Sequence, residues 1–204
     1  MPYRDNREYR AMTSFDVIAS EEESYIVEGY ASTFDVYDLF ESNGITYKEH
    51  IEPSAFENCD MRDVVFLKDH EGTVFARSKN GSLQLSVDGH GLKVRADLSL
   101  TAHSREAYEE IKSGLYTQMS FAFVVAENGD SFDNMTHTRN IHSIRKLFDV
   151  SYVMRPANNY TDISVATRSV FDGFIENERV ELLKRENEQR LALAKAKFDF
   201  LKEN

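Results

Sequence analysis

The chain has 204 residues, a hydrophobic fraction of 41% and a formal net charge of -11 at pH 7, which fits one main domain with an appendage. Nucleic-acid binding needs clusters of Lys and Arg against phosphates, and no such cluster occurs, so we expect no nucleic-acid partner. A single cysteine, Cys59, excludes an internal disulfide and a multi-cysteine metal site, and no stretch approaches the roughly 20 apolar residues of a membrane span. We therefore expect a reducing, cytoplasm-like location away from membranes.

The first third of the chain predicts strands separated by loops. Residues 1–24 are polar and are expected to form an N-terminal arm that leads into a first strand. β-Branched and aromatic residues, short apolar runs and a proline then predict four elements: a strand over Tyr25–Ala31, a long loop over Phe34–Glu49, a short helix near Pro53–Phe56 and a buried strand over Val64–Leu67.

The clearest pattern in the middle of the chain is a β-hairpin. Apolar and polar residues alternate over Leu83–Val87 and again over Leu92–Leu98, and Asp88–Gly91 between them tolerate positive φ. The remaining elements expected before the tail are a helix over Thr101–Ser113 closed by Gly114, an alternating strand over Met119–Val125, a polar and mobile loop over Glu127–Asn140, and a strand over Ile144–Val153.

The composition changes after about Arg168. Phe174–Lys202 is rich in Glu, Lys, Arg, Leu and Ala, contains neither Gly nor Pro, and places apolar residues at heptad-like spacing, with a polar interruption over Lys184–Arg190. It predicts a long helix that packs on a partner or on the domain, or is a solvated terminal helix. The predicted organisation is an arm over 1–24, a main domain over 25–168 and a helical tail over 169–204. The fold class is α+β, a mostly antiparallel β-barrel or sheet with helices around it.

Three residues have types and positions that suit nucleophilic catalysis. His70 follows a buried strand, Ser120 points away from the apolar face of its strand, and Asp149 lies inside an apolar strand, where a carboxylate is costly unless it is paired. Each also has an ordinary structural interpretation, and spacing alone does not bring the three together. A loose metal site from Asp133, His137 and His142 is a weaker alternative.

The order of several motifs resembles the prohead maturation protease family of tailed bacteriophages. The matching segments are Val27–Asp35, Glu49–Phe56, Val65–His70, Leu83–Asp88, Gly91–Leu92, Gly114–Leu115 leading into Met119–Phe123, Asp149–Ser151, and Pro156–Ala157 with Thr161. The resemblance implies a serine endopeptidase related in fold to herpesvirus assemblin, a β-barrel wrapped by helices, with no cofactor.

The resemblance also implies the role of each site residue. Ser120 corresponds to the nucleophile, His70 to the base and Asp149 to the third member, where the family usually has the longer Glu. Assemblin uses a second His in that place, so His142 stays as a reserve candidate. Arg155 is one candidate for the oxyanion hole.

The implied partners are the major capsid protein precursor and the scaffold protein, cut together with the protease itself inside the assembling prohead in the host bacterial cytoplasm. A homodimer is a further expectation, because assemblin-like relatives dimerise, and the tail is expected to dock or to link to scaffold. Two rival hypotheses are a non-catalytic, scaffold-like assembly factor and a metal-dependent hydrolase built on His137 and His142.

Overall fold

The computed structural model describes residues 7–16, 18–19, 25–42, 44–154 and 165–202. The chain divides into two compact units, Met1–Ser164 and Val165–Asn204, which are described separately below. Within the described residues, no helix is both long and apolar enough to cross a membrane.

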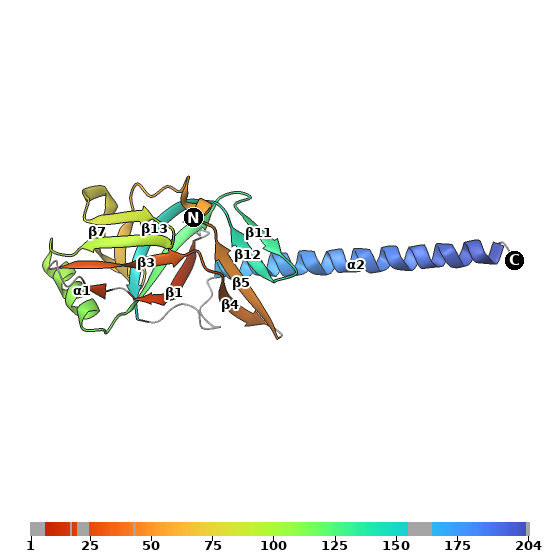
Figure 1. Cartoon of the computed structure of the whole chain (residues 1–204), viewed down its shortest axis with the longest axis horizontal. Coiled ribbons are helices and arrows are strands. Elements are labelled where there is room, and N and C mark those ends of the chain that lie inside the picture. Colours follow the sequence, from red (N-terminus) through yellow and green to blue (C-terminus); the bar gives the residue numbers. More distant parts are fainter. Residues whose placement is uncertain (1–6, 17, 20–24, 43, 155–164, 203–204) are drawn as a thin grey trace. The chain divides into compact units, whose positions relative to one another are not determined.

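The N-terminal unit contains strands and few helical turns (Figure 1). Its elements in chain order are β1 (Glu8–Asp16), β2 (Ile18–Ala19), β3 (Ile26–Thr33), β4 (Tyr37–Ser42), β5 (Ile45–Ile51), the 3₁₀ turn η1 (Pro53–Phe56), β6 (Val65–Lys68), β7 (Glu71–Arg77), the 3₁₀ turn η2 (Ser78–Asn80), β8 (Leu83–Val87), β9 (Gly91–Asp97), α1 (Ala102–Lys112), β10 (Gln118–Val125), β11 (Asp130–Asp133), β12 (Thr138–Ile141) and β13 (Ile144–Val153).

These strands form three sheets. Their orders are β1-β10-β13-β6-β7, β11-β12-β5-β4 and β2-β3-β9-β8, and every pair is antiparallel except β13 with β6 and β12 with β5. None of the sheets closes into a barrel within the described residues. The α+β class with mostly antiparallel sheets is therefore confirmed, whereas the barrel is not, and the relation to assemblin stays a prediction.

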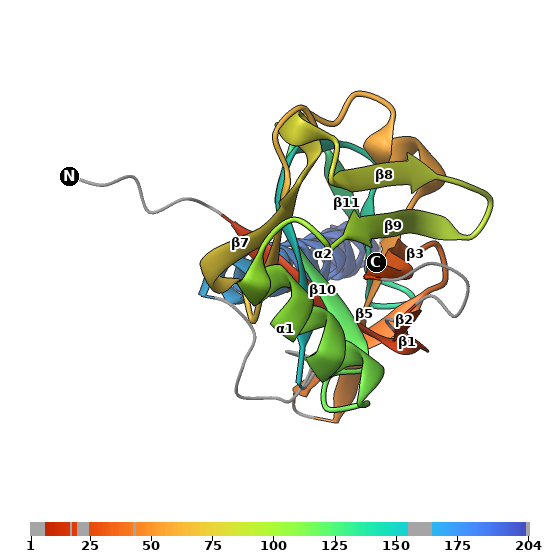
Figure 2. The same cartoon turned by 90° about the vertical axis from the view of Figure 1, so that its left-hand side faces the viewer.

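The predicted β8–β9 hairpin and the predicted helix α1 are both present, with the alternation and the capping residues that the sequence indicated. β8 pairs antiparallel with β9, and the alternating residues Leu83 and Val94 are buried. The Thr101 side chain caps α1 by accepting from the backbone N–H of Ser104, and Gly114 follows the helix with a φ of 76°. Figure 2 shows α1 and the β8–β9 hairpin, and α1 contacts β2 and β7.

Two loop predictions are wrong. The segment Phe34–Glu49 contains the antiparallel β4–β5 pair, and the segment Glu127–Asn140 contains most of the β11–β12 pair. Both segments escaped detection because their strands bury charged residues, Glu49 in β5 and Arg139 in β12, where a search for apolar alternation expects hydrophobic ones. β12 then pairs with β5, so the two missed hairpins share one sheet.

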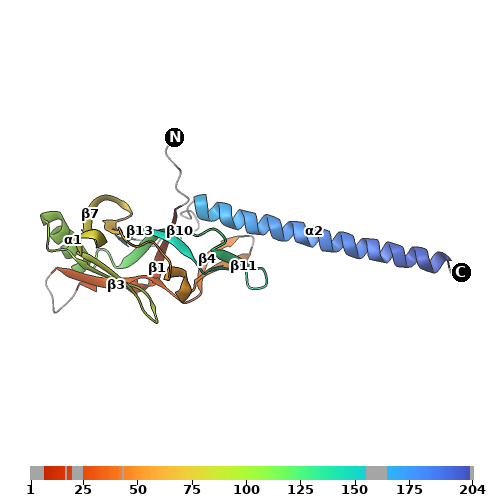
Figure 3. The ribbon, with the colours of Figure 1, turned by 90° about the horizontal axis from the view of Figure 1, so that it is seen from above.

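The N-terminal segment contributes an edge strand to the five-stranded sheet. β1 pairs antiparallel with β10, with Ala11 opposite Ser120, and β2 continues into the sheet of β3 (Figure 3 shows β1, β10 and β13 from above). On β10, Met119, Phe121 and Phe123 are buried in the core, as their alternation predicts, so the intervening Ser120 faces the opposite side of the sheet.

The C-terminal unit is the helix α2 (Val165–Lys202). The predicted long helix is confirmed and continues through the polar stretch 184–190, because most of those residues are good helix formers whatever their polarity. Among its described side chains, Leu182, Leu183, Leu191 and Leu193 are exposed.

Candidate active site

Three neighbouring strands bring the predicted site residues to one face of the five-stranded sheet. Ser120 on β10 lies opposite Ser151 on β13, and Asp149 lies two residues before Ser151, so it points to the same face. β6 flanks β13 on its other side and leads directly into His70. The strand order thus joins residues that lie 50 and 79 positions from His70 along the chain.

A tight turn aims His70 at the two strands. Lys68 pairs with Glu71 across the β6–β7 hairpin, and the two residues between them, Asp69 and His70, have φ values of 48° and 61°. Positive φ at both central residues is typical of a type I′ hairpin turn. The His70 backbone N–H also donates to Ser151 Oγ at 3.2 Å, which fixes the turn against β13.

His70 bridges the other two residues through its ring. Its Nδ1 lies 2.6 Å from Asp149 Oδ1 and its Nε2 lies 2.6 Å from Ser120 Oγ. With the proton on Nδ1, the ring donates to the carboxylate and leaves Nε2 free to accept the hydroxyl proton of Ser120. Ser151 Oγ donates to the same Asp149 oxygen at 2.9 Å, so the carboxylate is held from two sides.

The other sequence candidates lie elsewhere. His142 Nε2 is 3.0 Å from the carbonyl oxygen of Asn128, so it is Asp149 and not His142 that meets His70. Arg155 and the segment 156–161 lie outside the described residues. In the part of the chain that the structure describes, no three His, Cys, Asp or Glu side chains gather as a metal site would require. Burial raises the pKa of the Cys59 thiol to about 12.

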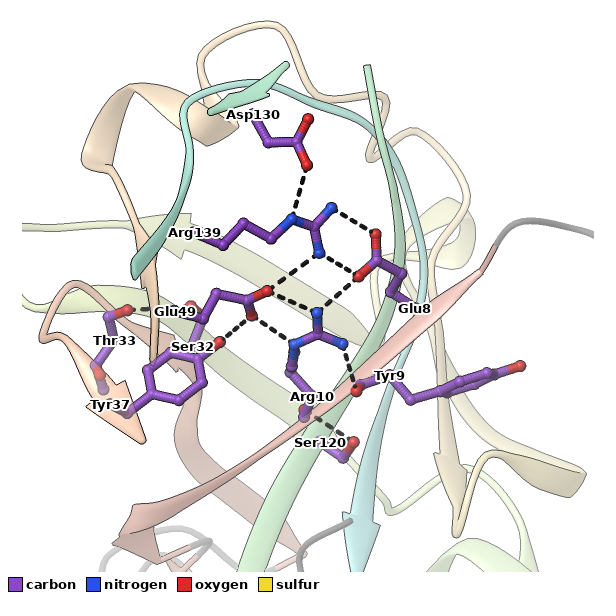
Figure 4. A network of polar contacts seen from close by, with 10 residues as sticks. All are labelled: Glu8, Tyr9, Arg10, Ser32, Thr33, Tyr37, Glu49, Ser120, Asp130 and Arg139. Carbon is purple, nitrogen blue, oxygen red and sulfur yellow. Dashed lines mark hydrogen bonds and ion pairs between the residues drawn. The ribbon is translucent and has the colours of Figure 1, made fainter. Parts of the chain in front are cut away.

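Sequence reasoning missed a group of charged residues beside Ser120, here called the charged cluster, which Figure 4 shows. Its members come from four strands of two sheets and are Glu8, Arg10, Glu49, Asp130 and Arg139. Arg10 donates to both oxygens of Glu49 and to Glu8, Arg139 donates to Glu8 and Glu49, and Arg139 Nε reaches Asp130 at 2.7 Å.

The charged cluster is almost entirely removed from water. Arg10 and Arg139 are each 1% exposed and Glu49 is 0% exposed. Burial alone would raise the pKa of Glu8, but Arg10 and Arg139 outweigh it and lower that pKa from 4.5 to about 2. Burial and the charge of Glu49 raise the pKa of Tyr37, whose hydroxyl donates to Glu49. One signal was available in the sequence, since Glu49 alternates with the apolar Tyr47 and Ile51, but pattern alone does not identify its partners.

The backbone of β1 connects the charged cluster to the catalytic candidates. The carbonyl oxygen of Arg10 accepts a hydrogen bond from Ser120 Oγ at 2.9 Å, and the Tyr9 ring lies edge-on to the His70 ring with centroids 4.7 Å apart. Ser120 is only 1% exposed as a result of its position between β1 and β13.

A serine, an imidazole and a carboxylate in hydrogen-bonded series form the arrangement that serine hydrolases use. The family comparison agrees with this class, because the model for the caudovirus prohead serine proteases matches residues 13–173. The chain therefore belongs to the caudovirus prohead serine protease family, a family of serine peptidases. The comparisons with curated proteins and with solved structures found no match.

Proposed function

We propose that this protein is the serine endopeptidase that cuts capsid and scaffold proteins, and also itself, inside the assembling prohead. The single observation that supports the proposal is the row of two 2.6 Å hydrogen bonds from Asp149 through His70 to Ser120. Membership in the prohead protease family supplies the class of substrate and the place of action.

In this mechanism Ser120 Oγ attacks the carbonyl carbon of the scissile bond while His70 Nε2 takes the hydroxyl proton. The imidazolium then gives that proton to the leaving amine, and a water molecule hydrolyses the acyl-enzyme with His70 again as the base. Proton transfer by a positioned group of this kind contributes roughly 10²–10⁴-fold to the rate.

Asp149 holds the His70 ring in the tautomer that the mechanism requires and stabilises the imidazolium that forms. Asp has a shorter side chain than the Glu expected for the family, and the 2.6 Å contact indicates that it still reaches the ring. The Ser151 hydroxyl, which contacts both Asp149 and His70, would keep the carboxylate oriented.

The long helix α2 suits a role in recruitment to the prohead. It carries exposed leucines, among them Leu182 and Leu191, on a helix of 38 residues. Exposed apolar side chains on a long helix are typical of a surface that packs on a helical partner, and scaffold protein is the proposed partner. Deletion of Phe174–Asn204 should leave peptide cleavage intact and exclude the enzyme from shells, and normal packaging of the truncated chain would contradict this role.

The proposed function is tested by co-expression with the capsid protein precursor. Wild type should shorten the precursor, and Ser120→Ala should leave it at full length. Ser86→Ala is the matched control, because Ser86 is an exposed serine on β8, outside the site, and it should process the precursor as wild type does. Processing by Ser120→Ala at the wild-type rate would reject the mechanism and favour a non-catalytic role in assembly.

A further inference from the structure

The nucleophile of this structure is covered by the chain's own N-terminal strand. Ser120 is 1% exposed, and β1 lies along the edge of β10 with Ala11 directly opposite Ser120. A substrate peptide bond must reach Ser120 Oγ, so the covering strand has to leave before any other polypeptide is cut. Over residues 8–12 β1 has β10 as its ladder partner on one side and is the terminal strand of the sheet, the position from which a strand can separate.

β1 also has the position of a bound substrate, because it is an extended strand paired with the edge of the sheet that carries Ser120. Proteins commonly bind extended peptides by adding them as a strand to a sheet edge, where main-chain hydrogen bonds give affinity and side-chain pockets give specificity. Here the carbonyl oxygen next to Ser120 Oγ, at 2.9 Å, belongs to Arg10. Because a carbonyl carbon lies about 1.2 Å from its oxygen, the Arg10 carbon is within about 4 Å of Oγ, close to the roughly 3–3.5 Å of a reactive approach.

The Ser120 proton has two acceptors within reach. The hydroxyl carries one proton, and both Arg10 O, at 2.9 Å, and His70 Nε2, at 2.6 Å, are positioned to accept it. While the proton points to Arg10, the base is not engaged. When it turns to His70, the oxygen faces the Arg10 carbonyl group with its proton already on the path to the base.

The side chain of Arg10 occupies a site that selects a basic group. It donates to both oxygens of Glu49 and is buried to 1% exposure, a bidentate pairing that an uncharged side chain does not reproduce. If residues 1–10 leave, Glu8 leaves with Arg10, whereas Glu49 keeps Arg139 and Tyr37 and Asp130 keeps Arg139. The three charged groups that remain are two carboxylates and one guanidinium, so the vacated pocket has a net charge of −1 and accepts a cation.

We propose that β1 is bound in the active site as a substrate, that the Arg10–Ala11 peptide bond is the first bond the enzyme cuts, and that the Glu49 pocket is the subsite for a basic residue before the cut. This inference rests on the proposed function, since it uses the same Ser120 and His70. The family match begins at residue 13, so the cut leaves the whole matched region on the enzyme.

The reaction uses only groups of the chain and one water molecule. Ser120 Oγ bonds to the Arg10 carbonyl carbon and its proton passes to His70, then the bond from that carbon to the Ala11 nitrogen breaks and the nitrogen receives the proton. Water attacks the Arg10 acyl-enzyme, His70 takes its proton, and residues 1–10 depart with a carboxylate on Arg10 while Ser120 regains its hydroxyl proton. The cut removes Glu8–Arg10 with the carbonyl that accepts from Ser120 Oγ and leaves Ala11 as a free chain end, so that the start of the strand can separate from β10 and uncover Ser120 for capsid and scaffold chains.

The first test is the N-terminus of the full chain after expression, read by intact mass and N-terminal sequencing. Wild type should begin at Ala11, and Ser120→Ala should keep Arg10 joined to Ala11. A wild-type enzyme that cuts the capsid precursor while residues 10 and 11 stay joined would overturn this inference and leave the proposed function standing. If the enzyme cuts neither the capsid precursor nor the Arg10–Ala11 bond, both this inference and the proposed function are overturned.

The second test separates the subsite from a structural role of Arg10. Wild-type enzyme that has processed itself is given two peptides covering residues 5–16 of this chain, one with the native Arg10 and one with Arg10→Gln. The arginine peptide should be cut with a kcat/KM about 100-fold higher, because a buried site built for a charged partner strongly rejects an analogue without it. Equal rates for the two peptides would overturn the assignment of the subsite. Because the same enzyme is used in both reactions, a folding defect cannot explain a difference between them.

A matched peptide controls for charge alone. Arg7→Gln removes a guanidinium that lies over the Phe148 ring, 3.8 Å from its centroid, outside the Glu49 pocket. That peptide should be cut at the rate of the native one, and a loss as large as that from Arg10→Gln would overturn the assignment of the subsite to Arg10.

Discussion

Two polar groups meet at Ser120 and differ in their burial, in their charge and in the strands that form them. The row of Ser120, His70 and Asp149 comes from adjacent strands of one sheet and keeps His70 partly open, with its side chain 15% exposed. The charged cluster joins strands of two sheets, and its members Glu8, Arg10, Glu49 and Arg139 are buried, while Asp130 lies at its edge with a side chain 20% exposed. The first group can exchange protons with a substrate, whereas the second can only hold strands in place until one of its members leaves.

The two groups should therefore respond differently to mutation. A catalytic row loses rate when one member is removed, because its function is a proton path and its contribution to folding is small. A buried ion-pair network loses stability, because removal of one partner leaves an uncompensated charge in a medium of low dielectric.

The largest effect is expected for His70→Asn. Asn tolerates the positive φ of this turn position, so the variant removes the base with little backbone strain. We expect kcat/KM for capsid-precursor peptides to fall by about 10⁴-fold or more, equivalent to roughly 5 kcal/mol in the barrier. The melting temperature should differ little from that of Ser120→Ala, which also keeps residues 1–10. A variant that loses its fold together with its activity would show that His70 contributes to stability as well as to rate, which would contradict the contrast between the two polar groups.

The next effect is expected for Arg139→Met in a Ser120→Ala chain, which keeps residues 1–10. The substitution removes a cation shared by Glu8, Glu49 and Asp130. Breaking a buried pair from one side costs about 3–5 kcal/mol in the free energy of unfolding, which denaturant titration measures. Arg145→Met is the matched control, because Arg145 is exposed on β13, and it should change that free energy by less than about 0.5 kcal/mol. Equal effects of the two substitutions would contradict the contrast.

Acid should weaken the charged cluster through Glu8. Its folded-state pKa is lowered to about 2 from an ordinary 4.5, so its contribution to stability is fully present above about pH 4.5 and is lost as the pH falls through 2. At neutral pH this contribution is about 3 kcal/mol, an order-of-magnitude figure from the size of the shift.

The comparison of Ser120→Ala with the double variant Ser120→Ala, Glu8→Gln, both of which keep residues 1–10, isolates this carboxylate from other acid effects. The difference in the free energy of unfolding between the two proteins should be largest above pH 4.5 and should shrink toward pH 2. A difference that stays constant over this range would show that the charge of Glu8 is not what holds the strand.

The smallest effect is expected for Ser151→Ala. The variant removes the hydroxyl that donates to Asp149 at 2.9 Å and accepts from the His70 backbone, so the carboxylate is held from one side only. A hydrogen bond to a charged group contributes about 1.5–3 kcal/mol, and we expect a fall in kcat of about tenfold or somewhat more with unchanged precursor specificity. An unchanged kcat would mean that Asp149 does not need this support.

Prediction from the sequence worked best where a residue lies on a regular strand or beside a turn. The alternation of Met119, Phe121 and Phe123 placed Ser120 on the opposite face, and the apolar run before Lys68 placed His70 at the strand end. Prediction failed for β4, β5, β11 and β12, because their buried positions include Glu49 and Arg139, and the partners that make such burial tolerable lie up to 131 residues away in the chain.

Local patterns were enough to predict the β-rich body, the hairpin over Leu83–Asp97, the helix before Gly114 and the three residues that could perform the chemistry, because these features depend on local periodicity, turn residues and residue type. The three-dimensional fold was needed to show that the three residues meet, that β1 covers Ser120, and that Arg10 lies between Glu49 and Glu8. Strand order and register set these contacts, and both follow from the packing of segments far apart in the chain, which no local pattern encodes.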